Sequence, residues 1–148
     1  MLENHSTPEF APEKWRDYLA TGCYTYAMQW HVKNFVLIGD IIDERVTECD
    51  DDDVIIDVLT RELAFLGYTI KECDVNFKSP EKSFKIFLMR YELTGHYHLL
   101  REDSNKQWSH KYPKELPTNK DYYGNIIENP LTLCDASYYG WCFLVSVN

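Results

Sequence analysis

A cysteine and a group of histidines are the side chains of this chain best suited to chemistry. Cys23 follows Gly22, where the backbone can turn sharply, and opens a segment with a helical period that runs to about His31. A thiol at a helix N-terminus lies at the positive end of the helix dipole, which favours the nucleophilic thiolate. The pattern therefore makes Cys23 the candidate nucleophile, with a buried structural thiol as the alternative.

The histidines that could work with this thiol lie far downstream in the sequence. His96 and His98 are two residues apart, so on a strand their side chains share one face. The polar turn REDSNK follows, and a second strand-like segment then brings His110. A hairpin that is symmetric about Ser104 places His98 directly across from His110, with Cβ atoms roughly 5 Å apart. Two imidazoles so placed share a hydrogen bond that fixes the tautomer of the working histidine.

Three interpretations of this hairpin stay open at this point. His96, His98 and His110 together supply three nitrogen ligands of the kind that an open zinc site uses. Alternatively, Cys23 and His98 act as nucleophile and base, and His110 orients the base. In the third interpretation the histidines satisfy only local hydrogen bonds, and the chain is a binding module without catalysis.

The order of the elements predicts an α+β domain with N-terminal helices packed on a C-terminal antiparallel sheet. A short helix is expected from Pro12, and the clearest amphipathic helix follows the aspartates 50–53, which should cap it, and ends at Gly67. These aspartates do not fit a calcium loop, because the glycine at its sixth position is missing. Segments rich in β-branched and aromatic residues then predict strands near 68–73, 83–94, 96–103, 107–112 and 140–147. We expect one domain over residues 1–148, with residues 1–11 as a tail.

Composition excludes several classes of function. The net charge of −9 disfavours nucleic acids and anionic membranes as partners, because their phosphates would be repelled. No apolar run approaches the ~20 residues of a membrane span, and the polar, acidic N-terminus is unlike a secretory signal. We therefore expect a soluble chain made in the cytoplasm, and export would need a specialised secretion system. The five cysteines form no CxxC pair, so four are expected to be structural thiols: Cys49, Cys73, Cys134 and Cys142.

Several short motifs resemble a known family. GCYTYA (22–27) resembles the start of a bacterial and phage group of papain-like cysteine peptidases. YHLLR (97–101), WSHK (108–111) and GNIIENP (124–130) are similar to the blocks that follow in that group. The order of one cysteine, one histidine and a second histidine twelve residues later also resembles the triad of NlpC-type cell-wall peptidases.

The resemblance implies a cysteine peptidase or amidase with the triad Cys23, His98 and His110, and no metal or organic cofactor. Tyr24, beside the nucleophile, and Trp108 would contact a peptide or protein amide substrate, such as a peptidoglycan peptide, although an aromatic residue such as Trp108 is more often core. The same triad could deamidate a protein glutamine or transfer an acyl group, as an effector or toxin would. Three departures limit what carries over: Tyr24 replaces the usual Ser or Thr, His96 replaces an acidic residue, and no glutamine precedes Cys23 to form an oxyanion hole.

Overall fold

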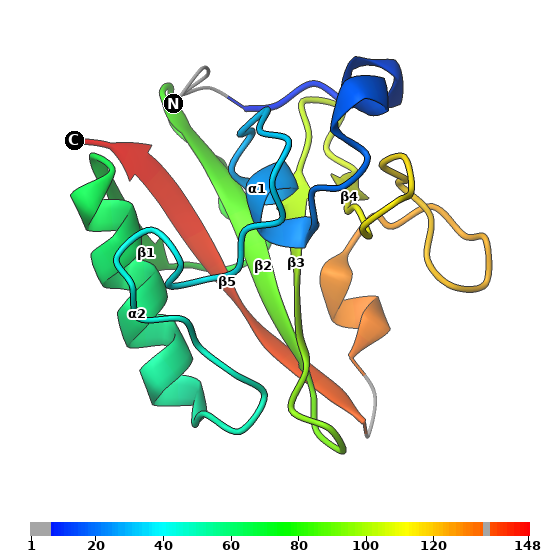
Figure 1. Ribbon diagram of the computed structural model, residues 1–148. Helices are drawn as coiled ribbons and strands as arrows, with labels where there is room; N and C mark the ends of the chain where they lie inside the picture. The colour runs from blue at the N-terminus through cyan, green and yellow to red at the C-terminus, as the bar shows by residue number, and fades with distance from the viewer. Residues whose placement is uncertain (1–6, 135–136) are drawn as a thin grey trace.

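One antiparallel sheet of five strands forms the centre of the structure, a computed structural model that describes residues 7–134 and 137–148. The strands lie in the order β1-β5-β2-β3-β4, with the C-terminal strand inserted between the first and the second (Figure 1). Four of them fall within the segments that alternating apolar and aromatic residues predict, and β5 begins two residues before its predicted segment. Their bounds are β1 Tyr68–Glu72, β2 Ser83–Tyr91, β3 Tyr97–Glu102, β4 Trp108–Ser109 and β5 Tyr138–Val147.

The helices lie mostly on one face of this sheet. α2 (Asp52–Phe65) lies along the side formed by β1 and β5, and α1 (Cys23–Ala27) lies over β3 (Figure 1). Two short 3-10 helices complete the set, η1 (Pro12–Tyr18) and η2 (Pro130–Leu133). The expected α+β class is therefore confirmed, and no helix within the described ranges is long and apolar enough to cross a membrane.

The helix that begins at Cys23 is shorter than its apolar period predicts. α1 ends at Ala27, and Gln29 adopts a positive φ of 62°. A left-handed residue ends an α-helix, because its backbone cannot continue the right-handed hydrogen-bond ladder. Trp30, which lies beyond that point, is still buried in the core, so burial rather than helical geometry explains the apolar period of the sequence.

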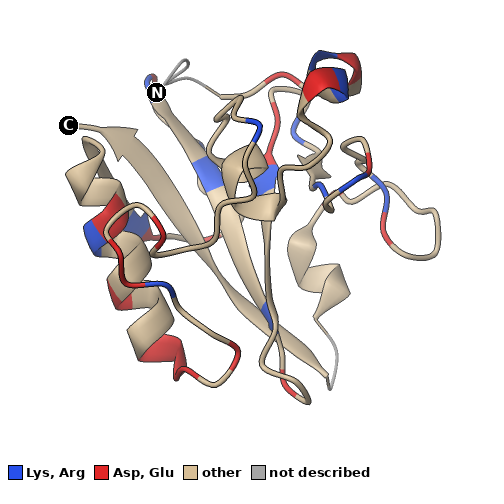
Figure 2. Cartoon of the chain, in the orientation of Figure 1, with Lys and Arg blue, Asp and Glu red and all other residues tan. Residues whose placement is uncertain are grey.

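α2 begins and ends close to where the sequence predicts, but its aspartates do not cap it with their side chains. The backbone carbonyl of Asp51 accepts the N–H groups of Val54 and Ile55, and the described side chains make no capping bond there. The Asp52 carboxylate instead forms an ion pair of 2.6 Å with Arg90 of β2. Figure 2 shows how strongly acidic residues gather on α2 and the loop before it.

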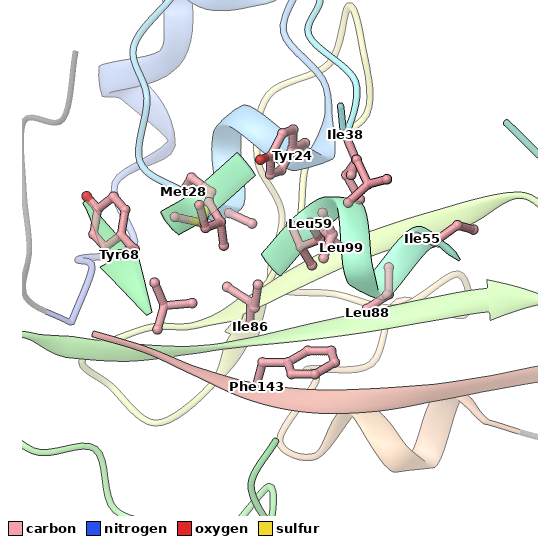
Figure 3. Packing of buried hydrophobic residues seen from close by; sticks show 14 of the residues in the cluster. Tyr24, Met28, Ile38, Ile55, Leu59, Tyr68, Ile86, Leu88, Leu99 and Phe143 are labelled. Atoms are coloured by element: carbon pink, nitrogen blue, oxygen red, sulfur yellow. The ribbon is translucent and has the colours of Figure 1, made fainter. Parts of the chain in front are cut away.

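Each face of the sheet carries its own apolar core. Between the sheet and the helices, Leu59 of α2 and Tyr24 of α1 pack with Ile86, Leu88 and other strand residues (Figure 3). The opposite face holds a smaller cluster, which includes Phe87, Met89, Leu100, Trp108, Ile127 and Cys142. Alternate residues of β2 and β3 therefore enter different cores, as the period of two in a strand requires.

Residues 7–11, expected as part of a tail, are bonded to the domain instead. The carbonyl of Pro8 accepts the N–H of Ser104 at 2.7 Å, and the carbonyl of Glu9 accepts from Arg101 at 3.1 Å. Residues 1–6 of the expected tail lie outside the described ranges.

A buried carboxylate of α2 holds the loop that precedes the helix. Glu62 has no exposed surface, and its oxygens accept the backbone N–H groups of Gly39, Ile41 and Ile42. The same carboxylate accepts the Tyr24 hydroxyl of α1 at 2.6 Å. A buried charge is tolerated when donors surround it in this way, so Glu62 joins α1, α2 and the 39–42 loop.

We predict that Glu62→Gln destabilises the fold, because an amide NH2 group would face donors that need an acceptor. Each buried donor left unpaired costs roughly 1–3 kcal/mol, so the unfolding free energy should fall by about 2–4 kcal/mol. Urea denaturation measures this change. Asp57→Asn on the exposed side of the same helix is the matched control and should stay within about 0.5 kcal/mol of the parent. Equal effects of the two substitutions would contradict the role of Glu62.

Candidate active site

The start of α1 is held by a lysine from the other side of the site. Lys111 follows His110 and is fully buried, and its ammonium donates to the backbone carbonyls of Leu19, Thr21 and Tyr112. Two of these carbonyls belong to the turn that leads into Cys23. The ammonium therefore fixes the beginning of α1 against the chain segment that carries His110.

The end of α1 is held by a second buried cation. Arg101 of β3 donates to the carbonyl of Tyr26 at 3.0 Å, and its guanidinium lies 3.8 Å from the centre of the Tyr26 ring. The carboxylate of Asp103, also buried, accepts from the same guanidinium at 2.9 Å. The last carbonyls of a helix need donors, so Arg101 anchors the helix end, and the Asp103 carboxylate neutralises the charge of the guanidinium.

The register of the β3–β4 hairpin differs from the expected one. Arg101 pairs with Ser109 and Glu102 with Trp108, so the turn is centred on Asn105 rather than on Ser104. In this register position 98 is opposite Tyr112, and the two rings stack with centroids 4.6 Å apart and an interplanar angle of 8°. The expected pairing of His98 with His110 is wrong as a direct pair, but both side chains still share a face and lie diagonally.

The diagonal arrangement still joins the two imidazoles by a hydrogen bond. His98 Nε2 and His110 Nδ1 are 2.8 Å apart, and His110 Nε2 lies 3.0 Å from the carbonyl oxygen of Lys120. A carbonyl only accepts, so His110 Nε2 carries a proton and, in the neutral ring, His110 Nδ1 is the acceptor. His98 Nε2 must then donate. The remaining nitrogen of His98, Nδ1, keeps its lone pair and has no hydrogen-bond partner in the described part of the chain.

Cys23 lies at the edge of β3, against the backbone of Leu99, the residue that follows His98. The bond from Tyr91 N–H to the carbonyl of His96 fixes which backbone groups of β3 face β2. By alternation, the N–H of Leu99 faces the other side, and it is one of the N–H groups that hydrogen-bond the Cys23 sulfur. Cys23 and His98 also line the same cavity of about 700 Å³.

The protonation of the two groups differs from what a helix N-terminus predicts. Burial raises the pKa of the Cys23 thiol to about 11, although the backbone N–H groups of Leu99, Cys23 and Tyr24 act in the opposite direction. The expectation of a lowered pKa for Cys23 is therefore wrong in its net direction. α1 has only five residues, so its dipole is small, and the loss of solvation outweighs it.

Both histidines are neutral for a similar reason. Burial, and to a smaller extent the neighbouring His110, together lower the pKa of His98 to about 3. Burial also lowers the pKa of His110, against a raising effect of the Lys120 carbonyl. In the described part of the chain no hydrogen bond joins Cys23 to His98, so the resting site holds a neutral thiol and a neutral imidazole rather than an ion pair.

The other side chains predicted for the site have different places. His96 is exposed and bonds Glu48 at 2.5 Å and Thr94 at 2.8 Å, away from the pair of imidazoles. Within the described ranges no three His, Cys, Asp or Glu side chains are grouped to hold a metal ion. Tyr24 lines the cavity, with its hydroxyl bonded to Glu62. Trp108 lies instead in the smaller core, with Phe87 and Leu100, and does not line the cavity.

Several contributors to the site carried no individual signal in the sequence. Tyr112 covers one face of the His98 ring, and the carbonyl of Lys120 sets the tautomer of His110. Lys111 lies beside His110 in the sequence, but its contact with the Leu19–Thr21 turn depends on tertiary packing. A backbone carbonyl has no side-chain signature, so its role is visible only once the chain is folded.

The chemical class of the site is a cysteine beside an oriented histidine pair, on an α+β domain. Comparison with family models, with curated proteins and with solved structures finds no match to this chain. The class therefore depends on the geometry described above.

We predict that iodoacetamide labels Cys23 slowly at neutral pH, because the thiol with a pKa near 11 is almost entirely protonated there. The labelling rate should increase about tenfold per pH unit from pH 7 to 10. Cys49, which is exposed, serves as the control and should react faster at pH 7. Peptide mass spectrometry after timed labelling measures both rates, and fast labelling of Cys23 at pH 6 would contradict the neutral resting thiol.

We also predict that acid destabilises the fold through His98. An unfolded imidazole binds its proton near pH 6.5, whereas His98 binds it near pH 3 in the folded chain. Between these values the unfolded state holds more protons, so the unfolding free energy falls as the pH falls. From pH 6.5 to pH 5 the contribution of His98 is up to about 2 kcal/mol. Urea unfolding across this range should show a shallower slope for His98→Gln than for the parent, and identical slopes would contradict it.

Proposed function

We propose that this chain is a cysteine-dependent hydrolase of amide bonds, in which Cys23 is the nucleophile, His98 the base and His110 a positioning residue. The observation that carries the proposal is the chain of hydrogen bonds from the Lys120 carbonyl through His110 to His98. It leaves a lone pair on His98 Nδ1, and His98 lines the same cavity as Cys23. A general base requires an imidazole whose tautomer is fixed and which has one nitrogen lone pair free to accept a proton.

The reaction begins with a neutral pair and needs a short movement of the thiol. The Cys23 sulfur turns from the N–H of Leu99 towards His98 Nδ1, and the S–H proton passes to that nitrogen as sulfur attacks the amide carbonyl. The imidazolium so formed keeps its Nε2–H bond to His110 Nδ1. His98 then returns the proton to the leaving amine, which gives a thioester on Cys23. Water, deprotonated by His98, breaks the thioester and releases the acid.

Two backbone groups are available for the oxygen that becomes negative. The N–H groups of Cys23 and Leu99 both face the sulfur. A carbonyl attacked by that sulfur places its oxygen close to them, and backbone donors of this kind stabilise a tetrahedral oxyanion. We assign these two groups to the oxyanion hole, which removes the need for a glutamine before Cys23.

A papain-like relationship is part of the same proposal. Cys23 is the first residue of α1, His98 lies on β3 and His110 follows twelve residues later. This order agrees with the order of the triad in NlpC-type peptidases. Deamidation or acyl transfer would use the same steps, with a different leaving group or acceptor.

A non-catalytic binding module is the second candidate. The raised pKa of Cys23 and the missing thiol–imidazole hydrogen bond within the described residues both favour it. The two candidates differ in one measurable outcome, since only the hydrolase forms a thioester at Cys23 when it meets an activated acyl donor.

We predict that the purified protein hydrolyses p-nitrophenyl esters of at least one acyl group between acetate and octanoate and that intact-mass spectrometry traps an acyl group on Cys23. His98→Ala should lower kcat/KM by at least about 100-fold, as loss of a general base does. Cys23→Ala should remove the activity. A panel that shows no hydrolysis and no acylated Cys23 would leave the binding module as the function.

Substitutions of His110 and His96, the other two histidines of the predicted site, separate positioning from packing. His110→Asn keeps a side-chain acceptor for His98 Nε2–H and should retain more activity than His110→Ala. His96→Ala should stay within about tenfold of the parent, roughly 1.4 kcal/mol in the barrier. The pH dependence of kcat/KM should shift in the His110 variants and not in His96→Ala. An essential His96 beside a dispensable His110 would contradict the assigned roles.

A further inference from the structure

The cavity beside Cys23 is large enough to hold more than the scissile bond. Its volume of about 700 Å³ lies within the range of pockets that bind small molecules. It extends from Cys23 and His98 across the segment 35–37 and 45–48 to the strand residues around Tyr91. A substrate attacked at Cys23 therefore has the part on one side of its scissile bond in or against this space.

Every permanently charged side chain that lines the cavity already has partners. Arg45 forms two hydrogen bonds with the Asp40 carboxylate, at 2.5 and 3.1 Å. Glu48 is paired with His96, and the Lys111 ammonium donates to three backbone carbonyls. All three charged side chains are therefore already hydrogen-bonded, although the Lys111 ammonium is bonded to neutral carbonyls and keeps its positive charge.

The rest of the lining is mostly apolar and aromatic. Its main members are Phe35, Leu37, Met89, Tyr91, Tyr97 and Tyr138. The Phe35 ring packs directly on the backbone before the nucleophile, since a Cβ on Gly22 would lie only 2.7 Å from it. Apolar walls that begin at the nucleophile favour an apolar group on the acyl side of the bond.

On this basis, and resting on the proposed hydrolase function, we propose that the acyl group of the substrate is neutral and apolar, either an aliphatic chain or an aromatic side chain that fills this cavity. The net charge of −9 acts in the same direction, because it repels anionic substrates at long range. A peptide rich in carboxylates, such as a cell-wall stem peptide, does not match the cavity.

The acyl preference can be measured with activated esters, because an ester and an amide of the same acyl group give the same thioester on Cys23. The series runs from p-nitrophenyl acetate through butyrate and hexanoate to octanoate. We expect kcat/KM to increase at least about tenfold from acetate to octanoate, since a single buried methylene can give that factor. A flat or falling series would overturn the proposal while leaving the hydrolase function in place.

Two further probes define the chemistry of the acyl group. p-Nitrophenyl pentanoate should react at least about tenfold faster than mono-p-nitrophenyl glutarate, which has the same length and one carboxylate. A preference for glutarate would overturn the proposal. The p-nitrophenyl ester of N-acetyl-phenylalanine then separates the two sources: a rate above that of octanoate indicates a hydrophobic peptide, and a lower rate indicates an aliphatic acyl chain.

The chain supplies a matched pair of variants for the cavity wall. Phe35 and Phe77 are exposed to a similar extent, 49% and 46%, but only Phe35 lines this cavity. Phe35→Asp should lower the ratio of the octanoate rate to the acetate rate at least about tenfold, and Phe77→Asp should leave this ratio as in the parent. A ratio is insensitive to the fraction of folded protein, so poor folding of either variant does not produce the result. Equal ratios in both variants would overturn the location of the acyl group.

Binding to Cys23→Ala tests the cavity without the chemistry. The fluorescent apolar probe N-phenyl-1-naphthylamine should bind this variant and be displaced by octanamide but not by glutaramate. If the parent hydrolyses no ester and this displacement still occurs, the proposed function fails and the apolar cavity stands. If neither probe binding nor an acyl preference is found, the inference about the cavity is wrong.

Discussion

The helix that carries Cys23 is too short to be stable by itself, and the arrangement of the site depends on the groups that hold it. Isolated helices shorter than about 12 residues are marginal in water, and α1 has five. Lys111 fixes its start, Arg101 its end and Glu62 the hydroxyl of Tyr24. All three charged groups are buried and surrounded by partners, so each would be costly to leave unpaired, and this cost defines one position for the helix.

The same burial that fixes the helix also determines the state of the site. Loss of solvation raises the pKa of Cys23 and lowers that of His98, so both are neutral at pH 7. A neutral pair avoids the cost of two buried ions at rest. In the proposed reaction, charge then has to form, and the His110 ring and the N–H groups of Cys23 and Leu99 can stabilise it. An apolar substrate that excludes more water would strengthen these interactions.

The strands and the long helix could be predicted from the sequence because local patterns define them. Alternating apolar residues located all five strands, and the run from Val54 to Leu66 located α2. The end of α1 could not be predicted, because the apolar residues keep a helical spacing beyond it. They do so because they are buried, while the left-handed backbone of Gln29 ends the helix itself. The centre of the hairpin lies one residue later than expected, so the partner of each residue moves by two positions. A move of two positions keeps the same face of the sheet, so His98 and His110 still share a face. The pKa of Cys23 depends on burial by distant segments, which no local pattern contains.

The short β4 has a consequence for how the protein behaves when it loosens. In the described sheet β4 pairs with β3 only at Arg101 and Glu102, so the first residues of β3 have no strand on that side. Cys23 and the start of α1 cover this edge. Should α1 detach, the uncovered backbone would offer a template on which a second chain could add a strand. Local opening at the nucleophile is therefore also the opening that would begin self-association, and selection for solubility would act on the same contacts as selection for the site.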